Sequence, residues 1–548
     1  MTAGTHPGTR STGRKAQGAS DASAAMGPGG PVPVAAHRGR QTRRGENVMQ
    51  RRRFMQTALG AAAMAALPTS AALAQAVRTL SKVDGAVEAI GLDGRKLTLE
   101  HAALEELRDS LQGRLLLPGH EGYDDARRVV NAGIDKYPAL VVQPTGASDV
   151  MRAVEFARQR DLLLAVKCGG HSYGGKSTCD GGLQIDLSTL RGTHVDARTR
   201  RAHVAGGSLL ASLDHEAMAQ GLVTTAGTVS HTGVGGLTLG GGFGRLARRF
   251  GLALDNVTAV DIVTADGKLL HANAEEHPDL YWGVRGGGGN FGVVTRFEFQ
   301  LHPMKRTVVG GDLLFPLSQL RDIARFYADY SRQAPDELYL DLIASSPIGQ
   351  PDGFVGMHVC YSGPEEKAEA ILAPLYKAGK PIRDGIERRD YVAIQRIHDN
   401  ADPRNHAQYL KSGFINEFPD ALVEVIADNF DGFVERGTML LFQHAGGAIG
   451  RVPADATAFA QRKAIANMLF FVRWPLAESP EQHVAYIREE WKAFEPFTDG
   501  WYANEVTNES SRVVGGNYQG NHARLVQVKN RYDPGNLFRL NANVLPTT

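Results

Sequence analysis

Hydrophobic residues in the first third of the folded chain alternate between strand-like and helix-like patterns. Residues 140–143 and 162–166 are short apolar runs, and between them residues 150–157 carry apolar side chains at helical spacing. Ser148 precedes this segment and is predicted to cap the helix. Residues 183–187 alternate apolar and polar positions, which indicates a third strand. The pattern predicts a β-α-β unit.

The pattern changes further along the chain. Residues 297–301 alternate like a strand, and from about 306 to 495 the helical pattern of 320–330 mixes with strand-like runs at 438–442 and 468–472. This predicts a second α+β domain at 306–495, inserted between residues 77–305 and a tail at 496–548.

Glycine is abundant, with 63 residues, and it gathers at 169–175, 232–244 and 286–292. Such segments let the backbone approach a ligand closely and present N–H groups to phosphate. Tight turns are the alternative for one segment, but three in one domain favour a dinucleotide site. Residues 287–292 match G-x-G-x-x-G, yet a strand pattern follows them, which argues against a Rossmann fold.

The first 76 residues are typical of an N-terminal targeting segment. Residues 1–48 lack Leu, Ile, Phe, Trp, Tyr and Cys, which predicts disorder. Three arginines at 51–53 precede an apolar run at 57–74 that ends in small residues. This predicts a twin-arginine signal peptide at 49–76, translation from Met49, and a periplasmic or secreted protein served by the Tat machinery. A single membrane anchor is the alternative interpretation.

Charge and cysteine content narrow the class of partner. Residues 1–53 hold 10 basic and 2 acidic residues, so the remainder carries a net charge of −7. That balance argues against nucleic acid as the main partner. Three cysteines, Cys168, Cys179 and Cys360, are too few for a disulfide framework, and their spacing fits no zinc site.

Five stretches together resemble a known family: residues 166–175, 183–187, 232–244, 502–504 and 524–538. They are similar to berberine-bridge-enzyme-like FAD-linked oxidases, whose FAD domain is of the vanillyl-alcohol-oxidase (PCMH) type. The resemblance spans about residues 121–546. It implies an α+β fold, with an FAD domain built from 77–305 and 496–548. It also implies that 306–495 is a substrate domain whose antiparallel sheet is backed by helices.

The resemblance implies FAD joined covalently to His171 through the flavin 8α-methyl carbon; a histidine that only hydrogen-bonds phosphate is the alternative. Val229 stands where many relatives carry a second, cysteinyl link, so a single link is expected. The other residues that the resemblance implies for cofactor binding are Lys167, Cys168, Gly169, Gly170, Ser172, Gly174, Gly227, Thr228, Thr232, Gly233, Gly235, Gly236, Gly240, Gly241, Gly242, Asn256, Val263, Asn290, Gly292, Val293, Tyr518, Asn541 and Asn543.

The resemblance also implies the chemistry, which is hydride transfer from substrate to flavin N5. Tyr502 holds the position of the base that takes the hydroxyl proton, with Asn504 beside it. A tyrosine with a pKa of about 10 needs nearby positive charge or hydrogen-bond donors for this role; a Tyr502 that only lines the flavin is the alternative. Tyr409 and Lys411 resemble substrate-facing positions, and His444 is a weaker candidate base.

These expectations combine into an exported FAD-dependent oxidoreductase acting on a hydroxyl-bearing small molecule. The substrate is a sugar, an oligosaccharide or a secondary metabolite, and the small Thr232 favours reoxidation by O2. The alternatives are an amine oxidase of the hydroxynicotine-oxidase type, a dehydrogenase that passes electrons to a quinone or cytochrome, and a non-catalytic flavin-carrying protein.

Overall fold

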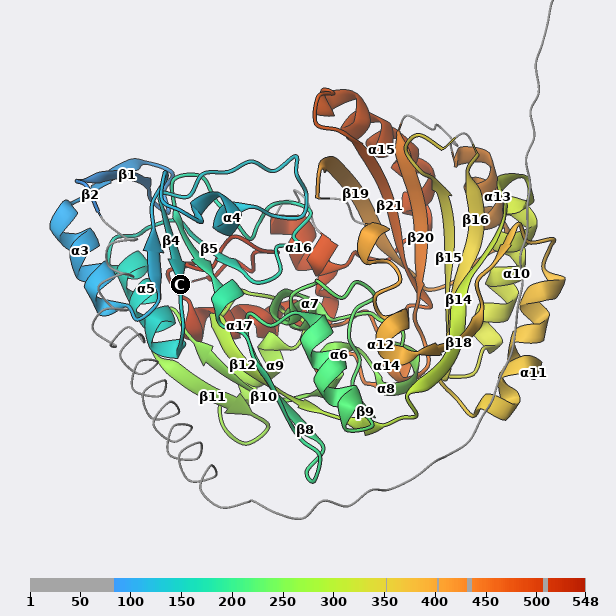
Figure 1. Ribbon diagram of the computed structural model, residues 1–548. Helices are drawn as coiled ribbons and strands as arrows, with labels where there is room; N and C mark the ends of the chain where they lie inside the picture. Colours follow the sequence, from blue (N-terminus) through green and yellow to red (C-terminus); the bar gives the residue numbers. More distant parts are fainter. Residues whose placement is uncertain (1–82, 351, 402–403, 431–435, 506–510, 548) are drawn as a thin grey trace, which may run out of the picture. The chain divides into compact units, whose positions relative to one another are not determined.

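The computed structural model describes residues 83–350, 352–401, 404–430, 436–505 and 511–547 (Figure 1). The signal peptide, the start at Met49 and the first residues of the expected FAD domain lie outside these ranges and stay predictions.

A four-stranded sheet of order β3-β4-β6-β5 contains the expected β-α-β unit, in which β4, β6 and β5 are parallel. The elements are β3 (Arg114–Leu116), β4 (Leu140–Gln143), α5 (Ala147–Gln159), β5 (Leu164–Lys167) and β6 (Leu183–Asp186). The predicted cap is wrong, because α5 begins at Ala147 and Ser148 already lies inside it. Asp149 instead accepts hydrogen bonds from the backbone of Gln112, Gly113 and Thr145 and thereby anchors the start of the helix.

A second, five-stranded antiparallel sheet has the order β11-β10-β12-β8-β7. Its strands are β7 (Thr193–Asp196), β8 (Arg201–Ala205), β10 (Val257–Val263), β11 (Leu269–Asn273) and β12 (Val293–Gln300). Strand β12 starts directly after Gly292, so the third glycine segment leads into a strand and not into a helix. The G-x-G-x-x-G match therefore lacks the Rossmann context.

The largest sheet is antiparallel throughout, with the order β17-β14-β16-β15-β20-β21-β19, and β18 also pairs with β14. Its strands are β14 (Thr307–Pro316), β15 (Leu338–Ser346), β16 (Phe354–Tyr361), β17 (Arg383–Asp384), β18 (Glu387–Asp390), β19 (His406–Ile415), β20 (Gly437–His444) and β21 (Ala466–Pro475).

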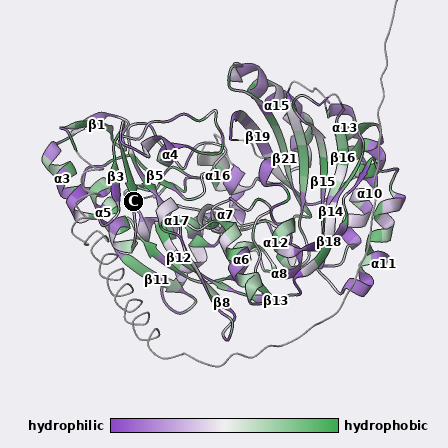
Figure 2. Cartoon of the chain, viewed as in Figure 1, coloured by the Kyte–Doolittle hydropathy of each residue, from purple (hydrophilic) through white to green (hydrophobic). Residues whose placement is uncertain are grey.

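Three helices pack against this sheet through one hydrophobic cluster: α10 (Leu320–Gln333), α13 (Asp420–Asn429) and α15 (Pro480–Phe494). Figure 2 shows hydrophobic residues along the strands and hydrophilic residues on α10 and α15. Burying the apolar stripe of each helix against the sheet is the main favourable contribution to this layer. No helix among the described residues is long and apolar enough to span a membrane.

The tail returns to the second sheet. Helix α17 (His522–Tyr532) places Leu525 and Val528 in the hydrophobic cluster of that sheet. The fully buried Lys529 forms an ion pair with Asp533 and also donates to the carbonyls of Asn290 and Phe538. These contacts hold the tail against the third glycine segment.

Candidate functional site

A cavity of about 320 Å³ lies where the glycine segments, the tail and β20 meet. That volume is within the range of small-molecule and cofactor sites. Sixteen of the residues predicted to bind cofactor or act in catalysis line it, although they are spread over 374 positions from first to last: Cys168, Gly169, Gly170, His171, Ser172, Gly227, Thr228, Thr232, Gly233, Gly235, Gly236, Gly292, Val293, Tyr502, Asn504 and Asn541.

The first two glycine segments touch through their backbones. A β-carbon placed on Gly169 would lie 2.3 Å from the backbone nitrogen of Gly233, and one placed on Gly233 would lie 2.4 Å from the Cys168 sulfur. Any larger residue would force the two segments apart. Gly236 differs, because a β-carbon there would meet no atom within 4 Å and would stand in the cavity itself. The backbone is thus bare where a ligand approaches.

Polar atoms of the tail also face this space. Asn541 lines the cavity, and its amide donates to the Phe538 carbonyl. Its oxygen is buried and accepts no hydrogen bond from the residues that the structure describes. Buried acceptors are normally satisfied, so this atom fits a donor supplied by a bound group. Bare glycine backbone and an unsatisfied amide oxygen suit the polar and phosphate parts of a dinucleotide.

His171 lines the cavity and has a second histidine behind it. Its Nε2 lies 2.8 Å from Nδ1 of His231, and Nε2 of His231 lies 3.1 Å from the Asp399 carbonyl oxygen. Burial, together with the neighbouring His231 and Arg404, lowers the pKa of His171 to about 3, although a backbone hydrogen bond to His231 opposes the shift. His171 is therefore a neutral imidazole near pH 7, the state in which a ring nitrogen is nucleophilic.

Tyr502 and Asn504 also line the cavity and contact each other. The phenol oxygen of Tyr502 accepts hydrogen bonds from the Gly242 backbone at 2.7 Å and from the Asn504 amide at 2.8 Å. These donors favour the phenolate, but burial is the larger effect and raises the pKa of Tyr502 well above 10. The expected hydrogen-bond donors are therefore present, but burial raises the pKa of Tyr502 by more than these donors lower it.

Glu505 is a cavity residue that the sequence analysis missed. It is buried, and its carboxylate accepts hydrogen bonds from the Asn467 amide at 3.3 Å. Burial raises its pKa to about 8, against the opposing hydrogen bonds from Asn467 and Ser412. A titratable carboxyl directly after a candidate catalytic motif was the available signal, but its burial could not be read from the sequence.

Several expected residues lie outside the cavity lining and support it. A β-carbon on Gly240 would clash with the Asn504 side chain, and one on Gly241 would lie 2.9 Å from the Tyr502 ring. Asn290 donates to the carbonyls of Gly287 and Ala542, which joins the third glycine segment to the tail. Lys167 forms an ion pair with the buried Asp186 at 3.3 Å, beneath the first glycine segment.

The remaining expected residues are not brought to the cavity lining: Gly174, Asn256, Val263, Tyr409, Lys411, His444, Tyr518 and Asn543. Asn256 donates to the carbonyls of Phe250 and Leu252, and Val263 and Tyr518 are buried in hydrophobic clusters.

His444 does not fit the role of a base in the cavity. It is buried, its Nδ1 accepts from the Leu340 backbone and its Nε2 donates to the Ser331 carbonyl. Burial lowers its pKa well below 6.5. Both ring nitrogens are therefore engaged by backbone groups of neighbouring elements.

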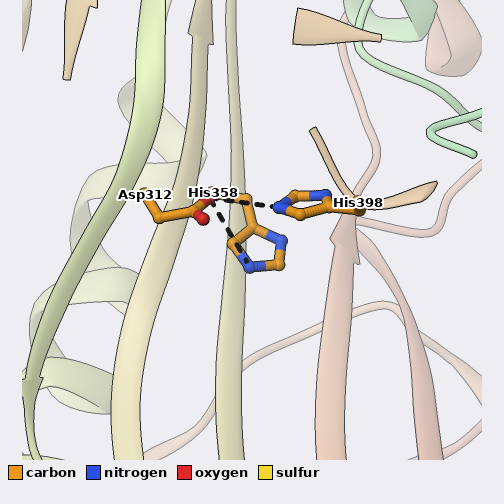
Figure 3. Close-up of side chains that lie close together, drawn as sticks. All are labelled: Asp312, His358 and His398. Atoms are coloured by element: carbon orange, nitrogen blue, oxygen red, sulfur yellow. Dashed lines mark hydrogen bonds and ion pairs between the residues drawn. The ribbon is translucent and has the colours of Figure 1, made fainter. Parts of the chain in front are cut away.

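A cluster of Asp312, His358 and His398 has the residue types of a metal site (Figure 3). Arg245 donates to Nδ1 of His398 at 3.1 Å. Neutral His398 then carries its proton on Nε2, which lies 3.2 Å from the Asp312 carboxylate. A metal would need the lone pair of that nitrogen, so the cluster is better described as a hydrogen-bonded network from Asp312 through His398 to Arg245.

Comparisons with known proteins agree with this site. A family described as FAD binding domain matches residues 138–273, and one described as berberine and berberine like matches residues 502–545. An FAD-linked oxidoreductase of Dictyostelium discoideum is 31% identical over 448 residues, covering 81% of this chain and 97% of its own. (R)-6-hydroxynicotine oxidase of Paenarthrobacter nicotinovorans is 29% identical over 456 residues, covering 80% and 97%.

Solved structures show the same fold. The 6-hydroxy-D-nicotine oxidase structure from Arthrobacter nicotinovorans has a TM-score of 0.73 and 29% identity, covering 79% of this chain and 98% of that one. A chitooligosaccharide oxidase has a TM-score of 0.73 at 23% identity, covering 81% and 100%. The α+β fold with a PCMH-type FAD-binding domain, the cofactor FAD and the enzyme class are thereby confirmed, and the chain belongs to the berberine-bridge-enzyme-like family of FAD-linked oxidoreductases.

Proposed function

We propose that this protein is an exported oxidase that removes a hydride from a hydroxyl-bearing small molecule and carries FAD covalently through His171 alone. The substrate class is a sugar, an oligosaccharide or a secondary metabolite. The observation that carries the proposal is that Tyr502, Asn504 and Glu505 line the same glycine-rich cavity as a neutral His171. The export rests on the sequence of residues 49–76.

FAD supplies the acceptor for the two electrons of the hydride. The glycine backbones of the first two segments and the Asn541 oxygen are the groups that hold it. Tyr502 binds the substrate hydroxyl and takes its proton in the phenolate form, which the Gly242 and Asn504 N–H groups stabilise against the effect of burial. Glu505 is close enough to Tyr502 to influence its ionisation, so its own protonation tunes this step.

A single covalent link is supported by the other side chains near the cavity. Val229 lines the cavity at the position of the expected cysteine and offers no nucleophile. Cys168 also lines it, but burial raises the pKa of its thiol, and the sulfur lies 3.6 Å from the Ser208 carbonyl. Cys179 is buried elsewhere, with a pKa raised to about 12. A thiol needs its thiolate form to react, so neither cysteine suits a second link.

An amine oxidase is the second candidate, and Glu505 is the observation that favours it. Glu505 places a carboxyl group in the cavity that in its ionised form would pair with a protonated amine, and the chain is similar to an (R)-6-hydroxynicotine oxidase. Amine oxidation by hydride removal needs no strong base, so the two candidates assign different roles to Tyr502.

The test is a substrate screen on the full chain with peroxide detection, followed by kinetics of Y502F and E505Q. For a hydroxyl substrate, Y502F is expected to lower kcat by roughly 10²- to 10⁴-fold. For an amine substrate, Y502F is expected to be nearly silent and E505Q to raise KM. Activity on hydroxyl compounds that survives in Y502F would contradict the proposed role of Tyr502.

A further inference from the structure

His171, His231 and the backbone carbonyl of Asp399 form a series of hydrogen bonds that leads away from the cavity-lining His171. His171 Nε2 lies 2.8 Å from His231 Nδ1, and His231 Nε2 lies 3.1 Å from the carbonyl oxygen of Asp399. The two histidine rings are 4.8 Å apart between centroids. His231 is not itself among the residues that line the cavity, and Asp399 approaches it from the segment that precedes β19.

The Asp399 carbonyl, the last group in this hydrogen-bond series, determines which histidine nitrogens carry protons. A carbonyl oxygen only accepts, so Nε2 of His231 carries a proton and donates it to Asp399. The Nδ1 of a neutral His231 is then an acceptor. Arg404, which can only donate, lies 3.4 Å from the same Nδ1 and agrees with that assignment. It follows that His171 donates from Nε2 and holds its lone pair on Nδ1.

The position of His231 is itself secured from the large-sheet side of the molecule. The Asp399 carboxylate accepts hydrogen bonds from the backbone nitrogen of Ser230 at 2.8 Å and from its hydroxyl at 2.7 Å. The residue that supplies the carbonyl for His231 thus also binds the residue before His231. This double contact fixes the distance between the Asp399 carbonyl and the imidazole ring.

We propose that His231 is a positioning residue for flavin attachment: it keeps the His171 lone pair on Nδ1 and accepts the Nε2 proton as Nδ1 bonds to the flavin 8α-methyl carbon. The inference rests on the covalent link at His171 put forward under Proposed function. It adds a second side chain, His231, to that link.

The step balances as follows. One C–H bond of the 8α-methyl group breaks, its proton leaves, and its electron pair reduces the isoalloxazine ring by two electrons. The Nδ1 lone pair forms the C–N bond, and the Nε2 proton moves to His231 and on to solvent. O2 takes the two electrons and, with the two released protons, becomes H2O2, which returns the attached flavin to its oxidised form.

The test measures bound flavin and attached flavin separately in the full chain. Total flavin is read from the absorbance of the native protein, and attached flavin from what stays with acid-precipitated protein. H231F and H231L both remove the acceptor but differ in shape, so the test needs only one of them to fold. H231N keeps an acceptor oxygen close to the place of Nδ1 and is the matched conservative variant.

Support for the inference is full FAD binding in H231F or H231L with attachment at least tenfold slower than in wild type, and H231N within a few fold of wild type. Wild-type attachment rates in H231F or H231L would overturn it, as would equal loss in all three variants. Wild-type protein that releases all its flavin in acid would also overturn it. Substrate oxidation by that same protein would still be measurable, so failure of this inference and failure of the proposed activity are distinguishable.

Discussion

The Asn504 amide donates to the Tyr502 phenol oxygen at 2.8 Å, and the same amide donates to the Leu237 carbonyl at 3.0 Å. Asn504 thus fixes the phenol oxygen relative to the helix α7 (Val234–Gly240), which lies within the second glycine segment. The absence of a side chain at Gly240 makes room for the asparagine. Tyrosine and asparagine act as one unit, in which the asparagine works through the tyrosine.

That relationship predicts non-additive kinetics. N504A removes one of two donors to the phenol oxygen, so kcat on a hydroxyl substrate is expected to fall by roughly tenfold to a hundredfold, the range for one lost charge-stabilising hydrogen bond. The double variant Y502F/N504A is expected to be no slower than Y502F. Multiplicative losses in the double variant would mean that Asn504 acts independently of Tyr502.

The raised pKa of Glu505 predicts a pH-dependent contribution to stability. The folded protein keeps this proton up to about pH 8, whereas the unfolded chain loses it near 4.5. The free energy of unfolding is therefore expected to fall as pH rises through this window, by up to about 1.4 kcal/mol per pH unit from this group. Asp214 and Asp341, also raised to about 7, add to the wild-type slope.

Urea unfolding of wild type and E505Q between pH 5 and 8 isolates the contribution of Glu505. E505Q is expected to lose stability less steeply with rising pH than wild type. E489Q, at an exposed glutamate paired with Lys492, is the control and is expected to run parallel to wild type. Parallel curves for E505Q and wild type would contradict the prediction.

Breaking the buried ion pair between Lys529 and Asp533 is expected to lower the stability of the protein strongly. Lys529 is fully buried with three acceptors, so K529M leaves Asp533 as an unpaired buried charge, at a cost of about 3–5 kcal/mol. R531A breaks the exposed pair with Asp279 and is expected to cost less than about 1 kcal/mol. The check is urea unfolding of both variants, and similar losses in the two would be inconsistent with a structural role for the buried pair.

A substitution at Gly236 is expected to weaken flavin binding without lowering the stability of the fold. A methyl group there meets no protein atom within 4 Å but occupies the cavity, so G236A is expected to keep the thermal stability of the flavin-free protein and to bind flavin at least tenfold more weakly. G146A, also without contacts within 4 Å but at a residue that does not line the cavity, is the matched control. Wild-type flavin binding by G236A would show that no ligand approaches this backbone.

Local patterns predicted much of the framework. Strand β4 matches the expected run at 140–143, and β20 and β21 enclose the expected strands at 438–442 and 468–472. These segments are recognisable because their side-chain period matches the strand that they form. The predicted cap at Ser148 was wrong because Asp149, through contacts with residues 36 and 37 positions away, anchors the start of α5.

The sequence by itself determined the family, the FAD-binding class, the glycine segments and the candidate residues His171, Tyr502 and Asn504, because each depends on residue types at short, regular spacing. The tertiary structure decided the protonation chemistry. His171 and His231 are 60 residues apart, and Asp399 is 168 residues from His231. Hydrogen-bond partners and burial arise from segments that meet only on folding, and they set which nitrogen holds a proton and which carboxyl stays neutral.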